Sequence, residues 1–174
     1  TEESARARGA KPLAELLGCA NNTDAHNPVS PDPEGTGAAA CMRLALCDAG
    51  ISPEQVDYIN AHGTATPMGD LAETRAIRRV FGGRAVPVSS TKGATGHMMG
   101  AGGVTELVAC VMAVNTGCLP PTLGCEVPDP DCDLAVVAGR ALPCDARIAM
   151  SNALGFGGQN SSVLVGRVQE VSGL

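Results

Sequence analysis

The chain has 174 residues, of which 44% are hydrophobic and 17% are charged. This composition excludes a disordered, highly charged chain, and the length suits one domain with a buried core. Its net charge of −6 and its three aromatic residues exclude the basic, aromatic-rich surfaces that bind nucleic acid. We find no secretory signal peptide and no apolar run of ~18 residues, so we expect no membrane span.

Eight cysteines are present, and their spacing contains no Cys-x-x-Cys pair and no zinc-binding pattern. We interpret them as reduced thiols that serve mostly as small hydrophobic side chains, which is typical of a cytoplasmic protein. The chain begins at Thr1 rather than at methionine, which we interpret as a sign of processing or excision.

The N-terminal third predicts a strand, a loop and a helix in that order. Residues 11–19 are predicted to form a strand, and the segment 21–35 is rich in Asn, Asp, Pro and Gly, which is typical of a loop. Residues 36–49 are predicted to form a helix that stops at Gly50, because apolar residues recur three or four positions apart. These residues are Ala39, Met42, Leu46 and Ala49.

The middle of the chain predicts a strand, a helix and a second strand. Val56–Ala61 and Val86–Ser90 have the composition of buried strands. Between them, a helix is predicted to begin at Asp70, with Glu73 at the position of a capping-box carboxylate, and to end at Gly82-Gly83.

The last third begins with a strongly apolar helix. Val104–Thr116 follows the small residues 100–103 and carries a single formal charge, Glu106, so we expect this helix to be buried on nearly all sides. Strands are then predicted near Leu134–Ala138, Arg147–Ser151 and Ser161–Val168. Alternation of strands and helices favours a mainly parallel sheet with helices on both faces. We expect no second domain.

Three glycine-rich stretches follow predicted strands. They cover residues 60–67, 89–97 and 151–158. Ligands of open α/β sheets bind beyond the carboxyl ends of the strands, so these stretches are candidates for one site. Each residue also has a simpler interpretation: His62 as a hydrogen-bonded histidine at a strand end, Glu73 as a helix cap and Phe156 as a surface plug.

Taken together, the three stretches resemble one family. Asn-Ala-His-Gly-Thr-Ala-Thr-Pro-x-Gly-Asp-x-x-Glu, Ser-Ser-Thr-Lys-x-x-Thr-Gly-His and Ser-Asn-x-x-Gly-Phe-Gly-Gly are similar to the motifs of the beta-ketoacyl-acyl carrier protein synthases, the condensing enzymes of fatty acid synthesis. The resemblance implies that residues 1–174 are the C-terminal half of a thiolase-like α/β fold. The expected sheet is mixed, mostly parallel and five-stranded, with helices on both faces.

The resemblance also implies a reaction, a decarboxylative Claisen condensation of malonyl-carrier protein with an enzyme-bound acyl group. His62 and His97 match the two histidines that donate hydrogen bonds to the malonyl thioester oxygen. Lys92 and Glu73 match a lysine and its glutamate partner, and we expect this pair to hold the imidazoles neutral and oriented.

Further residues match substrate-binding and cation-binding positions of the family. Thr64 and Thr66 match the threonines that bind the phosphopantetheine arm, and Phe156, with Gly155 and Gly157, matches the gating loop and its oxyanion-hole N–H. A structural monovalent cation, with an ordinary buried polar cluster as the alternative, is implied at Asn60, Glu106, Ser151 and Asn152. No other cofactor is expected.

The family's nucleophilic cysteine lies in a small-residue turn of the N-terminal half, and none of the eight cysteines has that context. We therefore expect the chain alone to be inactive. The expected partners are acyl carrier protein and either the missing half or a complementary subunit, with a homodimer in the intact enzyme. The lysine motif resembles the free-standing fatty acid type. The alternatives are a non-catalytic carrier-protein-binding or partner subunit, and a thiolase-like transferase, whose Gly-His-Pro motif is missing.

Overall fold

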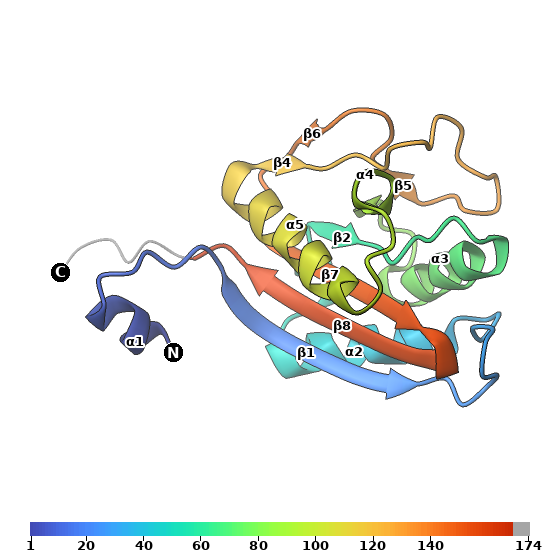
Figure 1. Ribbon diagram of the computed structural model, residues 1–174, viewed down its shortest axis with the longest axis horizontal. Helices are drawn as coiled ribbons and strands as arrows, with labels where there is room; N and C mark the ends of the chain where they lie inside the picture. Colours follow the sequence, from blue (N-terminus) through green and yellow to red (C-terminus); the bar gives the residue numbers. More distant parts are fainter. Residues whose placement is uncertain (169–174) are drawn as a thin grey trace.

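The fold is built on a six-stranded mixed sheet in the order β1-β8-β7-β2-β3-β5, in a computed structural model that describes residues 1–168 (Figure 1). The strands are β1 (Glu15–Thr23), β2 (Tyr58–Asn60), β3 (Pro87–Ser89), β5 (Ala135–Val136), β7 (Ile148–Gly155) and β8 (Gln159–Gly166). Strands β7, β2, β3 and β5 run parallel, whereas β1 and β8 pair antiparallel with their neighbours. The predicted mixed, mostly parallel α/β sheet is confirmed, with six strands rather than five.

Helices cover both faces of this sheet, as predicted. Helices α2 (Thr36–Ala49) and α3 (Pro67–Phe81) pack on one face, and α5 (Gly102–Thr116) packs on the other (Figure 1). Successive side chains of a strand point to opposite faces, so the strands contribute to two separate cores. The core under α2 and α3 contains Ile59, Met150 and Leu164, and the core under α5 contains Tyr58, Ala149 and Val165.

Several short elements escaped the sequence analysis because each is too short to show a periodic pattern. They are the helices α1 (Glu2–Ala7) and α4 (Lys92–Thr95), the 3₁₀ turns η1 (Pro53–Gln55), η2 (Met99–Ala101) and η3 (Phe156–Gly158), and a two-stranded sheet of β4 (Cys118–Leu119) and β6 (Leu142–Pro143). The predicted strand 11–19 is displaced, since β1 begins at Glu15 and continues through Thr23.

Helix α3 begins earlier than predicted. Thr66 is its N-cap and Pro67 its first residue, where the fixed φ of proline favours the helix. Asp70 is therefore not the N-cap, and the predicted capping box with Glu73 is wrong. The carboxylate of Glu73 instead binds backbone N–H groups outside the helix. The end of the helix at Gly82 is as predicted.

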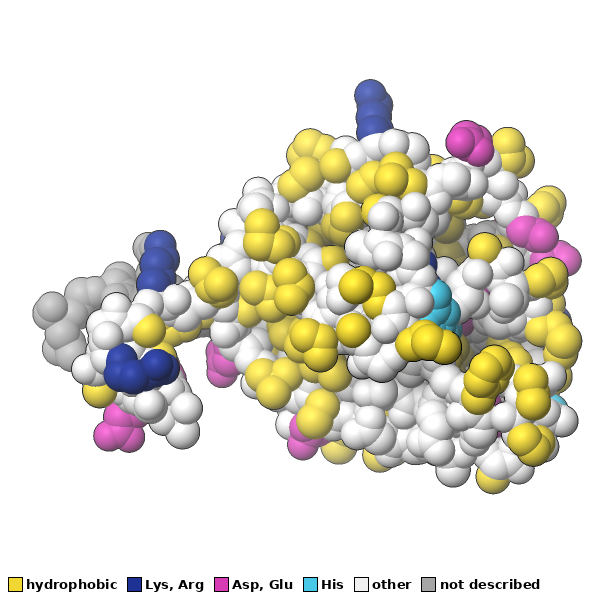
Figure 2. Space-filling view, in the orientation of Figure 1, with side chains coloured by type: hydrophobic (Ala, Val, Ile, Leu, Met, Phe, Trp, Pro, Cys, Tyr) yellow, Lys and Arg dark blue, Asp and Glu magenta, His cyan; other side chains and the backbone are white. Residues whose placement is uncertain are grey.

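Helix α5 is not buried on all sides. Its inner face packs on β7 and β2 through Cys110, Ala113 and Val114, but Val104 and Val108 are 68% and 55% exposed. These two side chains and Met112 form what we call the α5 outer face, and apolar side chains cover much of the surface in this region (Figure 2). The segment Met99–Thr116 is long and apolar enough to cross a membrane by length and composition, a weak criterion that core helices of soluble proteins also meet.

Candidate active site

His62 lies in the loop that connects β2 to α3. Glu73, from the second turn of α3, reaches back to this loop and accepts hydrogen bonds from the backbone N–H groups of His62 and Gly63, both at 2.9 Å. Each oxygen of the carboxylate binds one N–H, so the position of the backbone at His62 is set by the helix that follows it. Burial raises the pKa of Glu73 to about 7, although the two N–H donors oppose this shift.

Gly63 brings the His62 loop against the segment that follows β3. Its φ is +39°, and a Cβ at this position would come 2.7 Å from the Cβ of Ser90. The hydroxyl of Ser90 donates to the carbonyl of Gly63 at 2.9 Å, and the N–H of Ser90 donates to Thr122 Oγ1 at 3.1 Å. The loops after two neighbouring parallel strands are thus joined at the carboxyl edge of the sheet.

Lys92 begins α4, directly after β3, and its ammonium forms an ion pair with Glu106 of α5. The pair is buried, because only 8% of the Lys92 side chain and 3% of the Glu106 side chain are exposed. The predicted pairing of Lys92 with Glu73 is therefore wrong. The family resemblance implied Glu73 as the partner of Lys92, but the oxygens of Glu73 are already bound to backbone N–H groups.

The rings of His62 and His97 meet edge to face, with centroids 5.5 Å apart and planes inclined by 87°. The backbone N–H of Met99 donates to Nδ1 of His97 at 3.1 Å. Since an N–H group can only donate, this nitrogen is an acceptor and a neutral His97 carries its proton on Nε2. In His62, Nδ1 is buried without a hydrogen-bond partner among the described residues, which leaves Nε2 as the nitrogen available to a ligand.

The environment of His62 favours its neutral form. Burial, followed by the positive charge of Lys92 and then by the neighbouring His97, lowers the pKa of His62 from 6.5 to about 4. His62 is therefore uncharged at neutral pH and can donate a hydrogen bond from Nε2 without carrying a charge of its own.

The other candidate substrate-binding residues lie on the same edge of the sheet. The hydroxyls of Thr64 and Thr66 are 3.1 Å apart in the loop that carries His62. Phe156 follows β7, which runs parallel to β2, and it is 81% exposed at the turn into β8. Gly155 precedes it in extended backbone, and Gly157 has a φ of +79° and donates its N–H to the carbonyl of Pro28.

The proposed cation ligands divide between the two faces of the sheet. Asn60 Oδ1 and Glu106 Oε2 are buried without hydrogen-bond partners among the described residues, and Ser151 of β7 is paired in register with Asn60. Asn152 is the next residue of β7, so its side chain points to the α2 face, where it accepts from Ser162 and donates to Met42. The Asn152 side chain therefore lies on the opposite face of the sheet from those of Asn60 and Ser151.

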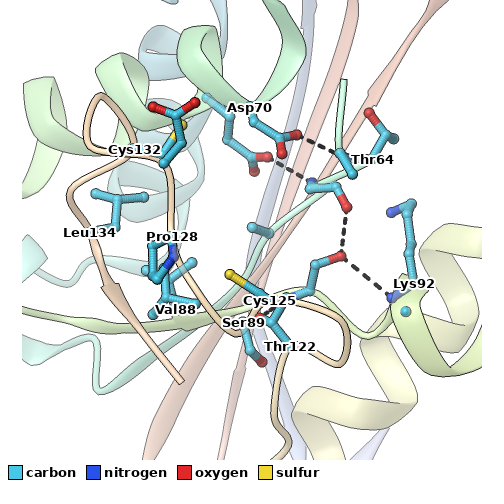
Figure 3. Close-up of a pocket in the computed structure, with 18 of the residues that line it drawn as sticks. Thr64, Asp70, Val88, Ser89, Lys92, Thr122, Cys125, Pro128, Cys132 and Leu134 are labelled. Atoms are coloured by element: carbon cyan, nitrogen blue, oxygen red, sulfur yellow. Dashed lines mark hydrogen bonds between the residues drawn. The ribbon is translucent and has the colours of Figure 1, made fainter. Parts of the chain in front are cut away.

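A cavity of about 450 Å³, which we call the lateral cavity, is bounded by α3, β3, β5 and the loop 122–134. Figure 3 shows Lys92 and Thr64 on one side, Val88, Pro128 and Leu134 on the other. His97 also lines it, and so do Cys125 and Cys132. The sequence analysis missed these two cysteines as site residues, because their place on a loop gave no periodic or motif signal.

His62 and His97 thus meet edge to face near the buried Lys92–Glu106 pair, at the carboxyl edge of the sheet. A histidine pair at this place on a thiolase-like half-fold agrees with the family that the sequence motifs resemble. The family described as "Beta-ketoacyl synthase, C-terminal domain" matches residues 13–126. The chain therefore belongs to the beta-ketoacyl synthase family.

Individual relatives agree with this assignment. The chain is 47% identical over 169 residues to the 3-oxoacyl-[acyl-carrier-protein] synthase 2 of Synechocystis sp. (strain PCC 6803), covering 96% of this chain but 41% of that relative. It superimposes on a ketosynthase/chain length factor structure named for ishigamide (TM-score 0.93, 41% identity, covering 96% and 41% of the two chains). It also superimposes on a structure of a type II polyketide synthase acyl-carrier protein in complex with its ketosynthase, with a TM-score of 0.94 and 34% identity. This match covers 97% of this chain and 42% of the matched chain.

Proposed function

We propose that this chain is the histidine-bearing part of a 3-oxoacyl-acyl carrier protein synthase that elongates acyl chains in fatty acid biosynthesis. The observation that carries the proposal is the pair of histidines, His62 and His97, whose rings meet edge to face with their centroids 5.5 Å apart. The name and 47% identity of the Synechocystis relative support the acyl-chain elongating reaction.

In the proposed reaction, the carbon–carbon bond to the carboxylate of a malonyl thioester breaks and carbon dioxide leaves. The electron pair of that bond collects as an enolate on the thioester oxygen. His62, which is uncharged at neutral pH, and His97 each donate an Nε2–H to this oxygen, and they act without reorganisation because Glu73 and the N–H of Met99 already fix their positions. An imidazolium would give up its proton more readily, and the lowered pKa of His62 avoids that loss.

The enolate carbon then attacks an acyl thioester, a new carbon–carbon bond forms, and the cysteine thiolate leaves. We propose that this cysteine comes from a complementary N-terminal part or subunit. The chain spans 41% of the length of the Synechocystis relative, and no hydrogen bond joins a cysteine to either histidine among residues 1–168. Cys110 is unsuited to the role, because burial raises its pKa to about 12.

The complementary part would also cover the α5 outer face. Val104, Val108 and Met112 are more than half exposed on a helix of 15 residues, and contiguous apolar surface of this kind marks a protein–protein contact. A homodimer of the completed enzyme and a cytoplasmic location belong to the same proposal.

Acyl carrier protein is the proposed partner that delivers the substrate. The printed description of one structural relative places an acyl-carrier protein in complex with its ketosynthase, at 34% identity to this chain. Thr64 and Thr66 offer two adjacent hydroxyls beside His62, which suits the amide groups of a phosphopantetheine arm.

A structural monovalent cation is the remaining part of the proposal. The unpartnered oxygens of Asn60 and Glu106 are hard ligands of the kind that such an ion prefers, and Ser151 lies in register beside Asn60. The ion would supply charge that balances Glu106 together with Lys92. In residues 1–168 no group of three or more His, Cys, Asp or Glu side chains could hold a metal, so the ligands of this ion other than Glu106 would be neutral oxygens.

A chimera tests the reaction. We would replace the C-terminal 41% of the Synechocystis synthase with this chain and measure condensation of acyl-carrier and malonyl-carrier protein. We expect activity, and we expect His97→Ala to lower kcat by about 100-fold or more, as removal of an oxyanion donor does. The matched control, His26→Ala, alters an exposed histidine and is expected to have no effect. A folded chimera without activity, or equal effects of the two variants, would overturn the proposal.

A further inference from the structure

A row of three polar side chains crosses the sheet on the face that α5 covers. Asn60 of β2 is paired in register with Ser151 of β7 and with Ser89 of β3. Asn60 shares its face with Tyr58, two positions earlier, and Tyr58 packs in the core under α5. We call Ser89, Asn60 and Ser151 the polar row. At most 5% of each is exposed, so their polar atoms need partners within the protein or in a bound group.

The phenol of Tyr58 fixes the amide of Asn60. The Tyr58 hydroxyl and Ser89 Oγ are 2.7 Å apart, and Asn60 Nδ2 donates to the Tyr58 hydroxyl at 3.2 Å. Because the phenolic oxygen accepts from Asn60, its O–H is free to donate to Ser89. Burial raises the pKa of Tyr58, so the phenol keeps this proton at neutral pH. The NH₂ end of the Asn60 amide is therefore turned to Tyr58, and the amide oxygen points away from it.

Two buried oxygens on the α5 face have no donor. Asn60 Oδ1 and Glu106 Oε2 both lack hydrogen-bond partners within the described part of the chain. Glu106 lies one turn before Cys110 on α5, and Cys110 packs in the same core as Tyr58. Burial raises the pKa of Tyr58 and of Cys110, and the nearby charge of Glu106 adds to both shifts. Since an amide oxygen and a carboxylate oxygen can only accept, neither satisfies the other, and both need a donor or a cation.

We propose that Tyr58, held by Ser89, is a positioning residue for the monovalent cation, because it presents the oxygen of Asn60 to the ion instead of the NH₂ group. An amide oxygen is a hard ligand that suits such an ion, whereas a reversed amide would present hydrogen atoms of positive partial charge. The inference rests on the cation of the proposed function and adds the residue that orients one of its ligands.

Removal of the phenolic oxygen is expected to reverse the amide. In Tyr58→Phe, Asn60 Nδ2 loses its acceptor and can turn to donate toward Glu106, whose Oε2 the ion would otherwise satisfy. The aromatic ring stays in the core, so we expect this variant to fold and yet to lose its response to the ion.

Urea unfolding of the full chain in potassium, sodium or choline chloride measures this response. One ionic strength keeps the screening of surface charges equal, and choline is too large for a buried site. At ten times its Kd, potassium or sodium is expected to raise the ratio of folded to unfolded chain about 11-fold over choline. In Tyr58→Phe we expect a rise of less than about twofold, and in Ser89→Ala, which removes the partner of the phenol, an intermediate one.

Ser162→Ala is the matched control. Ser162 is 2% exposed and its hydroxyl donates to Oδ1 of Asn152 at 2.8 Å, so this variant also removes a buried hydroxyl from an asparagine amide, but on the α2 face. We expect it to lower the stability in all three salts and to keep the full response to potassium or sodium. An unchanged response in Tyr58→Phe, or an equal loss of response in Ser162→Ala, refutes the role of Tyr58.

A water molecule that donates to both oxygens predicts equal stability of the unmodified chain in the three salts, and that result also contradicts the inference. The chimera separates this failure from failure of the proposed reaction. A chimera whose condensation depends on His97, built from a chain without a cation response, refutes only the cation and the role of Tyr58. A folded but inactive chimera refutes the condensation, while a cation response that is lost in Tyr58→Phe still supports the inference.

Discussion

Replacing Lys92 by methionine removes one charge of the buried Lys92–Glu106 pair and keeps an apolar side chain of similar length. Because 8% and 3% of the two side chains are exposed, water cannot replace the lost partner of Glu106. Removal of one partner from a buried pair typically costs ~3–5 kcal/mol of unfolding free energy. In the double variant Lys92→Met/Glu106→Gln both charges are gone, and we expect at least half of this loss to be recovered.

The same substitution changes the titration of His62. Burial is the largest cause of its low pKa, and the charge of Lys92 is the next. Lys92→Met is therefore expected to raise the pKa of His62 from about 4 toward 6.5, with burial keeping it below that value. In the double variant the change is expected to be smaller, because the negative charge of Glu106, which favours the imidazolium, is removed as well.

The sign of the pH dependence follows from this shift. The folded chain lowers the pKa of His62, so the group stabilises the fold above pH 6.5, and this contribution is lost as the pH falls through about 4. The shift of the pKa from 6.5 to about 4 corresponds to a contribution of at most ~3 kcal/mol to the free energy of unfolding. Solvent screening at the partly exposed ring makes this contribution smaller. In Lys92→Met we expect a smaller loss of unfolding free energy between pH 6.5 and about 4, because the pKa of His62 is less depressed.

Two measurements check this reasoning. NMR titration of the three histidine ring signals, assigned with single histidine variants, gives the pKa of His62 in each protein. Urea unfolding between pH 4 and 8 gives the stabilities. An unchanged pKa of His62 in Lys92→Met would refute the electrostatic role of Lys92. A double variant as unstable as Lys92→Met would refute the assignment of that loss to the uncompensated charge of Glu106.

The remaining predictions concern the loop, a carboxylate and a surface. Gly63→Ala is expected to destabilise by about 1–3 kcal/mol in thermal unfolding, more than Gly82→Ala, since both have positive φ but only Gly63 has a side chain within 3 Å of the added Cβ. Because the pKa of Glu73 is raised, this group stabilises the fold below pH 4.5, and the contribution is lost as the pH rises through about 7. Glu73→Gln is therefore expected to remove this decrease of the unfolding free energy with pH, measured by urea unfolding. An unchanged pH dependence in the variant contradicts the assignment to Glu73. The isolated chain is expected to self-associate, as measured by light scattering. Val108→Lys on the α5 outer face is expected to reduce self-association more than Val127→Lys on a loop. A monodisperse monomer of the unmodified chain contradicts this prediction.

Local sequence patterns determined the parts of the fold that depend on neighbours in the chain. The apolar periodicity of 36–49 and the stop at Gly50 predicted α2 correctly, and the glycine-rich stretches after the strands placed His62, Lys92 and Phe156 on one edge of the sheet. These predictions succeeded because helix periodicity, glycine stops and strand–helix alternation are encoded within short windows of sequence.

Contacts between distant segments were decided only in the tertiary structure. Spacing predicted Glu73 as a helix cap, and the family resemblance implied it as the partner of Lys92. The fold instead turns Glu73 toward the N–H groups of His62 and Gly63 and brings Glu106 to the lysine from a helix on the other face of the sheet. Asn152 likewise follows Ser151 in sequence, yet it points to the opposite face. Side-chain direction in a strand, and which of two carboxylates meets a cation, depend on register and packing across the sheet, which no local pattern records.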